Sequence, residues 1–335
     1  MANTAPKLRT RPAAPGAAPS ATFSPRRTAL HLVPPAPTSA EVAEARGQAA
    51  PFIKWVGGKS KLLGKLDALR PAHVQRYAEP FVGGGAFFYH LWNQGGLEHA
   101  TLCDLNTDVV TVLAVVRDQL PALLVALRRH QSRYLALDET GRAAYFYQVR
   151  ARHPDDHPTN DVERAARMLF LNRTCFNGLW RENRSGRFNT PHGRYKKPTI
   201  APAERLRVAS IALHEAEVLR ADFRALPELA ARNGIDFVYL DPPYHPISAT
   251  SAFNAYSQGG FSAQDQAELA EVCGQLDAAG VRFMLSNSDC PLIRDLYRGF
   301  DISTIQASRA VNCKADGRGT VSEVVVRNRR PGLVW

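Results

Sequence analysis

The sequence predicts an α/β fold built around a mostly parallel sheet. Short apolar segments typical of strands alternate with amphipathic segments typical of helices. The predicted strands are residues 76–79, 100–103, 235–240 and 281–286, and the predicted helices are residues 86–93, 107–129 and 263–279. This alternation indicates parallel strands, because a helix usually returns the chain between them. A glycine-rich turn after the first predicted strand is also typical of such folds.

The end of the chain predicts a different connection. The last predicted helix opens with Ser262 as N-cap and Asp265 at the capping-box position. Beyond the final parallel strand, the segments FDISTIQASRA and GTVSEVVVRN flank a polar turn that contains glycine. We therefore expect an antiparallel hairpin that closes one edge of the sheet.

A tail and an insertion are predicted around this sheet. Residues 1–50 are rich in Ala and Pro and carry six Lys/Arg against two Glu, which is the composition of a disordered basic tail. Residues 116–205 are helical at first and then basic and loop-like. We interpret them as an insertion that separates two parts of one domain, residues 51–115 and 206–335.

The composition narrows the partners and the compartment. The chain of 335 residues has a net charge of +11, which favours a polyanionic partner, although ribosome-associated and membrane-surface proteins share this property. Five scattered cysteines without a Cys-x-x-Cys pair argue against disulfides and a zinc site. No apolar run approaches the roughly 20 residues that span a bilayer. We expect a cytoplasmic monomer that binds neither metal nor membrane.

The glycine turn AEPFVGGGAFF predicts a ligand site. Gly83, Gly84 and Gly85 would let the backbone approach a ligand at the carboxyl edge of the sheet. The dinucleotide-binding fingerprint requires a glycine at the position of Phe88. The phosphate-binding loop is also absent, because no Gly-Lys-Ser/Thr follows the glycines. A nucleoside without phosphates therefore fits better. Asp104 ends the next strand and can accept hydrogen bonds from both ribose hydroxyls; the alternative is a helix N-cap.

These features together suggest S-adenosylmethionine as the cofactor. The upstream segment FIKWVGGKSKLL adds Trp55, Gly57 and Lys59. They offer a stacking ring, a flexible turn and a cation, suited to an adenosyl group and a carboxylate. The alternative is a surface turn with a core tryptophan.

The segment DPPY follows Leu240 at the carboxyl end of a predicted central strand, where open α/β sheets bind ligands. Asp241 supplies an acceptor, Pro242 and Pro243 offer carbonyls on a stiff backbone without N–H groups, and Tyr244 adds an aromatic face. Two acceptors and a ring suit a planar amine. Accepting both amine hydrogens favours a pyramidal nitrogen whose lone pair can attack a methyl donor. The alternative is a strand terminator with a half-buried tyrosine.

The order of four blocks resembles a known family. KWVGGK (54–59), EPFVGGG (79–85), LFLNRTCFNGLWRENRSGRFNTPHGRYKKP (169–198) and DPPY (241–244) resemble the Dam-type, α-class D12 DNA adenine methyltransferases, which act on N6 of adenine. The similarity covers residues 51–327. It implies a Rossmann-like S-adenosylmethionine-dependent methyltransferase fold with an inserted, mainly helical DNA-recognition domain.

The resemblance also implies roles for individual residues. The methyl-donor site would comprise Trp55, Gly57, Lys59, Phe81, Gly83, Gly85, Asp104 and Asp222. The catalytic motif would be Asp241, Pro242, Pro243 and Tyr244. The tyrosine would stack on the target adenine, which must leave the duplex because its amino group is otherwise paired.

The middle block has a physical interpretation of its own. Residues 173–197 carry seven Lys/Arg against one acidic residue, interleaved with aromatic side chains, which suits a DNA groove; the alternative is a solvated basic loop. The resemblance implies a wedge at Phe176, where tyrosine is more usual, and positions that open the duplex, read GATC or contact phosphates. The DNA-binding residues implied by the block are Lys54, Arg173, Phe176, Asn177, Leu179, Arg181, Asn189, Pro191, Tyr195 and Lys196.

The sequence therefore predicts an enzyme that transfers the methyl group of S-adenosylmethionine to N6 of a flipped adenine in double-stranded DNA, within GATC. We expect it in a bacterial or phage setting, associated with the nucleoid through DNA. A cytosine-N4 enzyme usually has Ser before Pro-Pro, and RNA and glutamine methyltransferases usually have Asn, so Asp241 favours adenine. Another adenine site, a noncatalytic DNA-binding relative and, disfavoured by Phe88, a nicotinamide oxidoreductase are the remaining alternatives.

Overall fold

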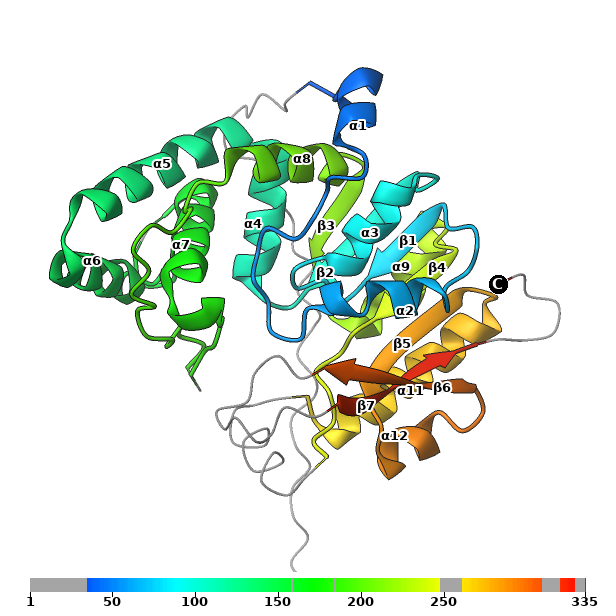
Figure 1. Ribbon diagram of the computed structural model, residues 1–335. Helices are drawn as coiled ribbons and strands as arrows, with labels where there is room; N and C mark the ends of the chain where they lie inside the picture. The colour runs from blue at the N-terminus through cyan, green and yellow to red at the C-terminus, as the bar shows by residue number, and fades with distance from the viewer. Residues whose placement is uncertain (1–34, 158, 184, 248–260, 309–319, 329–334) are drawn as a thin grey trace, which may run out of the picture. The chain divides into compact units, whose positions relative to one another are not determined.

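The computed structural model describes residues 35–157, 159–183, 185–247, 261–308, 320–328 and 335. Residues 34–335 form one compact unit. Its centre, within the described residues, is a seven-stranded sheet in the order β3-β2-β1-β4-β5-β7-β6 (Figure 1). The strands are β1 (Arg76–Glu79), β2 (His99–Asp104), β3 (Ala216–Arg220), β4 (Phe237–Leu240), β5 (Arg282–Ser288), β6 (Asp301–Ser308) and β7 (Thr320–Arg327).

The pairing of the strands confirms the predicted sheet. Strands β3, β2, β1, β4 and β5 are parallel, while β7 runs antiparallel between β5 and β6. The order 3-2-1-4-5 is that of a doubly wound Rossmann-like sheet, in which the strand order reverses between β1 and β4. The antiparallel β6–β7 hairpin is confirmed, and its turn lies outside the described residues. The pattern did not predict β3, an edge strand with half-exposed side chains and no apolar run.

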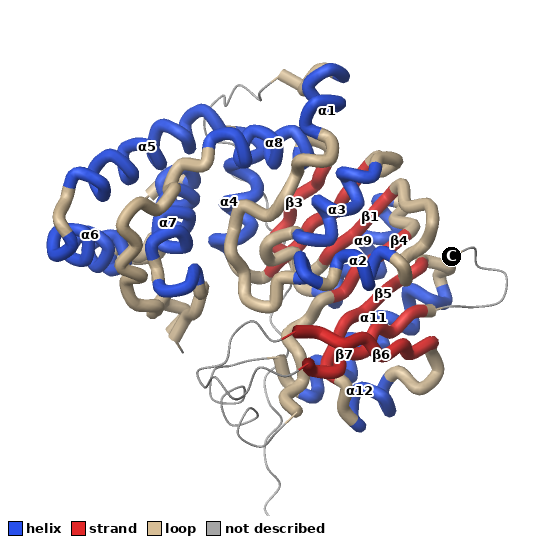
Figure 2. Tube along the Cα trace, viewed as in Figure 1, coloured by secondary structure: helices blue, strands red, loops and turns tan. Residues whose placement is uncertain are grey.

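Helices cover both faces of the sheet (Figure 2). Successive strand residues point to opposite faces: Tyr77 and Phe237 belong to one apolar cluster, and Ala78 and Val238 belong to the other. Helices α2, α3, α4 and α8 contribute side chains to the first cluster. Helices α9, α11 and α12 contribute side chains to the second. The helices are α1 (Ser39–Ala45), α2 (Leu63–Asp67), α3 (Ala86–Gln94), α4 (Thr107–Asp118), α5 (Leu120–Ala136), α6 (Glu139–Ala151), α7 (Asp161–Thr174), α8 (Ala203–Leu213), α9 (Leu226–Asn233), α11 (Ala263–Ala278) and α12 (Pro291–Leu296), with short 3₁₀ turns η1 (Lys59–Lys61), η2 (Phe176–Gly178) and η3 (Phe223–Ala225).

The C-terminal part of the predicted tail, residues 35–50, is folded, so the expectation of disorder is wrong there. Helix α1 begins with a capping box in which Thr38 and Glu41 bond each other's backbone N–H groups. Arg46 then lies over the Trp92 ring at 5.0 Å and donates to the Trp92 carbonyl at 2.9 Å. A short capped helix tied to α3 can thus order itself despite an Ala-rich composition. The rest of that prediction lies outside the described residues.

The predicted helix over residues 107–129 is divided into α4 and α5, which meet at an angle of 115°. Pro121 in the first turn of α5 explains the break, because proline lacks an N–H donor and its ring clashes with the preceding helical turn. Helices α5 and α7 pack against α4, and α6 packs against α5 and α7, away from the sheet (Figure 1). The predicted boundary after residue 115 therefore falls inside α4.

Two further properties concern only the described part of the chain. No single helix there is both long and apolar enough to cross a membrane; α4 and α5 reach that length and composition only when they are taken together as a bent pair. The same residues contain no group of three or more His, Cys, Asp or Glu side chains that could hold a metal ion.

Candidate active site

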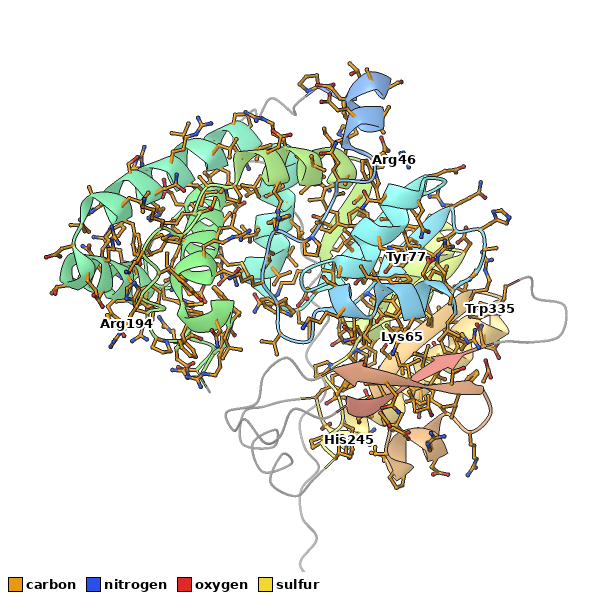
Figure 3. All side chains as sticks on the ribbon, viewed as in Figure 1. Arg46, Lys65, Tyr77, Arg194, His245 and Trp335 are labelled. Carbon is orange, nitrogen blue, oxygen red and sulfur yellow. The ribbon has the colours of Figure 1, made fainter. Side chains whose placement is uncertain are left out.

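The DPPY segment lies where the sequence predicted, at the carboxyl end of the central strand β4. All four residues of β4 are buried, and the strand pairs with β1 on one side and β5 on the other. Asp241 is therefore the first residue that leaves the sheet, at the point between β1 and β4 where the strand order reverses and where such sheets usually bind ligands. His245, labelled in Figure 3, follows the segment.

A buried ion pair joins two of the predicted site residues. The Nζ of Lys59 lies 2.7 Å from each oxygen of the Asp241 carboxylate, and the two side chains are 7% and 19% exposed. Lys59 also donates to the carbonyl of Gly57 at 2.8 Å, in a turn where Gly57 adopts a φ of +79°. We expected Lys59 to bind the carboxylate of the methyl donor; here its ammonium group is bonded to Asp241.

The surroundings of Asp241 set its protonation. Burial raises the pKa of Asp241, the Lys59 ammonium opposes that rise, and the charge of Glu323 adds to it. Lys59 thus favours the ionised carboxylate. A carboxylate has about four lone-pair positions, so two remain as acceptors after Lys59 has bonded each oxygen once.

Tyr244 is held by a residue that the sequence did not indicate. Its hydroxyl donates to Oε2 of Glu323, on β7, at 2.9 Å. The Nζ of Lys59 lies 4.8 Å from the centre of the Tyr244 ring. Burial raises the pKa of Tyr244, with nearby Asp241 adding to the effect, so the phenol remains a proton donor. The ring is fixed by one hydrogen bond and one cation.

The two proline carbonyls differ in their partners. Gln266, on α11, donates from Nε2 to the Pro243 carbonyl at 3.0 Å. Pro242 is buried, and no described residue donates to its carbonyl. Within the described residues, the carbonyl of Pro242 is therefore the acceptor next to Asp241 that is left for a ligand.

The glycine turn after β1 is hydrogen bonded to Asp104, the last residue of the neighbouring strand β2. Gly83 adopts a φ of +46°, and a Cβ there would lie 2.5 Å from Cδ1 of Trp55. Its N–H donates to Oδ2 of Asp104 at 3.0 Å, and the N–H of Asn106 donates to Oδ1 at 2.9 Å. The N-cap of α4 is Asn106, so the alternative assignment of Asp104 as the helix cap is wrong. Gly85, with a φ of +68°, starts α3.

Replacing Gly83 with alanine is expected to weaken binding of the methyl donor at least about tenfold, because the new Cβ would displace Trp55 and the left-handed backbone would be strained. Gly64→Ala is the matched control: Gly64 lies in α2, and a Cβ there meets nothing within 4 Å. Calorimetric titration of both variants with S-adenosylmethionine measures the effect. Equal affinities for the two variants would contradict it.

The remaining predicted cofactor residues lie around the same edge. Phe81 stacks on Phe223 with ring centres 5.8 Å apart, and the Leu105 side chain, next to Asp104, is 57% exposed. Asp222 caps η3 and accepts from both the backbone N–H and the guanidinium of Arg224, at 2.9 and 3.0 Å. The carboxylate of Asp222 is therefore already paired with Arg224.

Glu79, the last residue of β1, is a buried carboxyl group that the sequence analysis did not assign a role. The hydroxyl of Tyr77 donates to its Oε2 at 2.9 Å. Burial raises the pKa of Glu79 to about 8; the Tyr77 hydrogen bond and the charge of Lys59 lower the pKa, and the charge of Asp241 raises it. Glu79 therefore carries its proton near neutral pH.

The raised pKa of Glu79 predicts a pH dependence of stability. Its ordinary pKa is 4.5 and its folded pKa is about 8, so between these values the folded protein holds a proton that the unfolded chain has lost. The free energy of unfolding should therefore fall by a few kcal/mol as the pH rises from about 5 to about 8. Urea unfolding of wild type and Glu79→Gln at several pH values isolates this contribution, because the variant lacks it. Parallel pH curves would refute the assignment.

The predicted DNA wedge lies at an exposed turn. In η2 the Phe176 side chain is 53% exposed, and Asn177 adopts a left-handed φ of 54°. The N–H of Phe176 donates to the carbonyl of Pro191 at 2.9 Å, and the carbonyl of Leu179 accepts from Thr190 at 2.6 Å. Four predicted DNA-binding residues thus lie in or next to this turn.

The other predicted DNA-binding side chains flank this turn. Nε of Arg181 donates to Oδ1 of Asn189 at 2.7 Å, and the backbones of the two residues are also hydrogen bonded. The Nζ of Lys54 lies 5.7 Å from the centre of the Tyr195 ring, and Lys196 is exposed. Phosphate or base edges could reach Arg181 and Lys196 directly.

Two residues at the end of α7, Asn172 and Arg173, bond the protein backbone near this turn. Arg173 was predicted to contact DNA instead. The guanidinium of Arg173 donates to the carbonyl of Phe52 at 2.8 Å, and burial lowers its pKa. Asn172 is fully buried and bonds the backbone of Lys54 at 2.9 and 2.8 Å and the carbonyl of Gly178 at 3.3 Å. In this structure Arg173 is directed to the protein backbone, and Asn172 fixes the segment that carries Lys54.

An aromatic stack joins the glycine turn to the basic loop. The ring centres of Trp55 and Trp180 are 6.5 Å apart and nearly parallel, and Trp180 also contacts Phe188 at 4.5 Å. Oε1 of Glu182 accepts from Trp180 at 2.8 Å and from Asn106 at 3.0 Å. Trp180 is thus buried between the two predicted binding regions.

The doubly wound sheet, with a glycine turn and an amine-type acceptor site at one edge, defines the class of Rossmann-like methyltransferases. Comparison with known proteins is more specific. The sequence model of the D12 class N6 adenine-specific DNA methyltransferases matches residues 55–311. The chain therefore belongs to this family and is an adenine-N6 DNA methyltransferase.

Similar proteins bear related names. A type II methyltransferase, M.MjaIII, of Methanocaldococcus jannaschii is 36% identical over 286 residues, covering 83% of this chain and 98% of that protein. The type II methyltransferase M1.LlaDCHI of Lactococcus lactis is 38% identical over 283 residues, covering 83% and 95%. The DNA adenine methylase of Escherichia coli K12 is 32% identical over 287 residues, covering 84% and 96%.

Proposed function

We propose that this methyltransferase uses S-adenosylmethionine to methylate N6 of an adenine that is flipped out of double-stranded DNA, within GATC. The observation that carries the proposal is an acceptor pair beside an aromatic ring. The pair consists of the Asp241 carboxylate held by Lys59 and the carbonyl of Pro242, to which no described residue donates, and the ring is that of Tyr244. A planar amine with two N–H donors matches this arrangement in both chemistry and shape.

The chain's own residues account for activation of the nitrogen. The adenine amino group donates one hydrogen to Asp241 and the other to Pro242, while Tyr244 stacks against the base. Accepting both hydrogens favours pyramidal geometry at nitrogen, so that its lone pair is no longer delocalised into the ring. Lys59 opposes the rise in the pKa of Asp241 that burial causes and so favours its ionised form. The surplus proton passes from the methylated nitrogen to water after transfer, so no separate strong base is needed.

The glycine turn fits the proposed cofactor. When bound, S-adenosylmethionine supplies the methyl group. Gly83 is a close-approach position, and the two oxygens of Asp104 are already oriented by backbone N–H groups, which leaves lone pairs for ribose hydroxyls. The exposed Leu105 and the half-exposed Phe81 offer apolar contact to an adenine ring. Holding donor and acceptor in line supplies much of the rate acceleration in such reactions.

Recognition of DNA is proposed for the insertion. Residues 116–205 carry seventeen Lys/Arg against nine Asp/Glu, an excess that favours the phosphate backbone. The exposed Phe176 at a rigid turn is suited to enter the gap that a flipped base leaves, and Arg181 and Asn189 offer the donors that read purine edges in the major groove. The GATC assignment rests on the matched positions of this block.

A digestion experiment tests the sequence specificity. Unmethylated plasmid DNA is incubated with the protein and S-adenosylmethionine, then digested with restriction enzymes that distinguish methylated from unmethylated GATC. We expect protection of every GATC site from the enzyme that requires unmethylated adenine. Methylated adenine outside GATC, with GATC sites still cleaved, would reject the specificity while leaving the activity intact.

A further inference from the structure

The DPPY segment cannot hold its own backbone in place. Residues 241–246 have no helical or strand hydrogen bonds, and both prolines lack an N–H donor. Three backbone groups of the segment are instead bonded to side chains from elsewhere: the carbonyl of Pro243, the N–H of His245 and the carbonyl of His245. Their partners therefore determine where the segment lies.

Those partners form a buried polar network. Gln266 on α11 donates to Pro243 at 3.0 Å and accepts from Nδ2 of Asn287 on β5 at 3.0 Å. Oδ1 of Asn287 accepts from the N–H of His245 at 3.2 Å, and the hydroxyl of Ser288 donates to the His245 carbonyl at 2.6 Å. All three side chains are at most 3% exposed, so bulk solvent does not reach them.

The network has one consistent orientation. The oxygen of Asn287 accepts two backbone N–H groups, from His245 and Ser288, at 3.2 and 2.8 Å. Its amide nitrogen must then face Gln266, which presents its oxygen in return. The Gln266 nitrogen is thereby turned to the carbonyl of Pro243. Reversing either amide would place donors against donors or acceptors against acceptors, which is costly in a buried site.

We propose that Gln266 and Asn287 are positioning residues for the methyl-transfer reaction. They tie down the second proline carbonyl, so that the first, that of Pro242, is the one presented beside Asp241 to the amino group. This inference rests on the proposed adenine chemistry. It adds the requirement that two amides outside the DPPY motif, on α11 and β5, set the position of its acceptors.

The size of the effect follows from the geometry. Displacing a reacting group by about 1 Å can reduce a rate by about 100-fold. Gln266→Met keeps the length of the side chain and removes both hydrogen bonds, so we expect a 10- to 100-fold lower rate of methyl transfer in a single turnover. The affinities for S-adenosylmethionine and for DNA should change less than about threefold, because neither binding region contacts Gln266.

The test compares wild type with Gln266→Met and Gln275→Met, the latter at an exposed position of the same helix. Single-turnover rates are measured together with both affinities, and a fluorescent adenine analogue at the target position reports base flipping. We expect only Gln266→Met to lose rate, with flipping and both affinities retained. Equal rates for the two variants, or a rate loss matched by lost affinity or lost flipping, would overturn the proposal.

A further variant keeps the test decisive if Gln266→Met does not fold. Ser288→Ala removes only the hydroxyl that bonds the carbonyl of His245, and it should lower the single-turnover rate about three- to tenfold with binding unchanged. Ser288→Thr keeps a hydroxyl and should restore the rate. An unaffected rate in Ser288→Ala would count against the network. Absence of methyl transfer by wild type would instead reject the proposed function itself.

Discussion

Asp241→Ala is expected to lower methyl transfer to adenine by about 100- to 1,000-fold, the loss typical when a group that stabilises a transition state is removed. The carboxylate is one of two acceptors for the amino group, and alanine offers none. Binding of S-adenosylmethionine should persist, because Gly83 and Asp104 lie at the ends of other strands. Transfer of a labelled methyl group from S-adenosylmethionine to DNA measures the rate.

The variant also leaves the buried ammonium of Lys59 without its partner, which costs about 3 to 5 kcal/mol when one member of a buried pair is removed. Its folded fraction must therefore be measured by thermal unfolding and the rate corrected for it. Asp295→Ala, at a side chain that is 72% exposed, is the matched control and should retain full activity. A corrected rate for Asp241→Ala within threefold of wild type would remove Asp241 from the chemistry.

Lys59→Met is expected to reduce the rate at pH 7 by about 10- to 100-fold, because the pKa of the buried Asp241 would rise further without the ammonium. The ionised carboxylate accepts the amino hydrogen more strongly than the protonated acid does. The acid limb of the pH–rate profile should therefore move to higher pH, and raising the pH should recover part of the activity. Single-turnover rates between pH 6 and pH 9 measure the shift.

Two comparisons isolate this role of Lys59. Lys59→Arg keeps the positive charge and should preserve the pH profile better than Lys59→Met. The double variant Lys59→Met with Asp241→Asn should be more stable than Asp241→Ala alone, since it leaves no unpaired buried charge. An unshifted pH profile in Lys59→Met, with weaker S-adenosylmethionine binding, would return Lys59 to the cofactor-binding role that the sequence suggested.

Much of the fold could be predicted because its signals are local. Strand β4 is a short apolar run, strand β5 contains one, and the capping box of α11 at Ser262 and Asp265 is confirmed by mutual hydrogen bonds. Pro121 is a local signal for the break between α4 and α5. The prediction of one helix over residues 107–129 followed the regular spacing of apolar residues and gave Pro121 too little weight. Edge strand β3 has no such run, so its pairing with β2 became clear only in the assembled sheet.

The candidate site was predictable where a motif lies in one segment, and not where contacts join distant segments. Glu323 meets Tyr244 only because β7 inserts next to β5. Gln266 carried a weak signal, since a polar residue stands on the buried stripe of α11 that Leu269 and Cys273 share. The pairing of Lys59 with Asp241 joins residues 182 positions apart, which no spacing rule relates.

The most direct test is the identity of the methylated nucleoside. Unmethylated DNA is treated with the protein and isotopically labelled S-adenosylmethionine, digested to nucleosides and examined by mass spectrometry. We expect the label in N6-methyldeoxyadenosine for wild type and for Asp295→Ala, and almost none for Asp241→Ala. Label in N4-methyldeoxycytidine, or undiminished N6-methyldeoxyadenosine from Asp241→Ala, would contradict an adenine site built on Asp241 and Pro242.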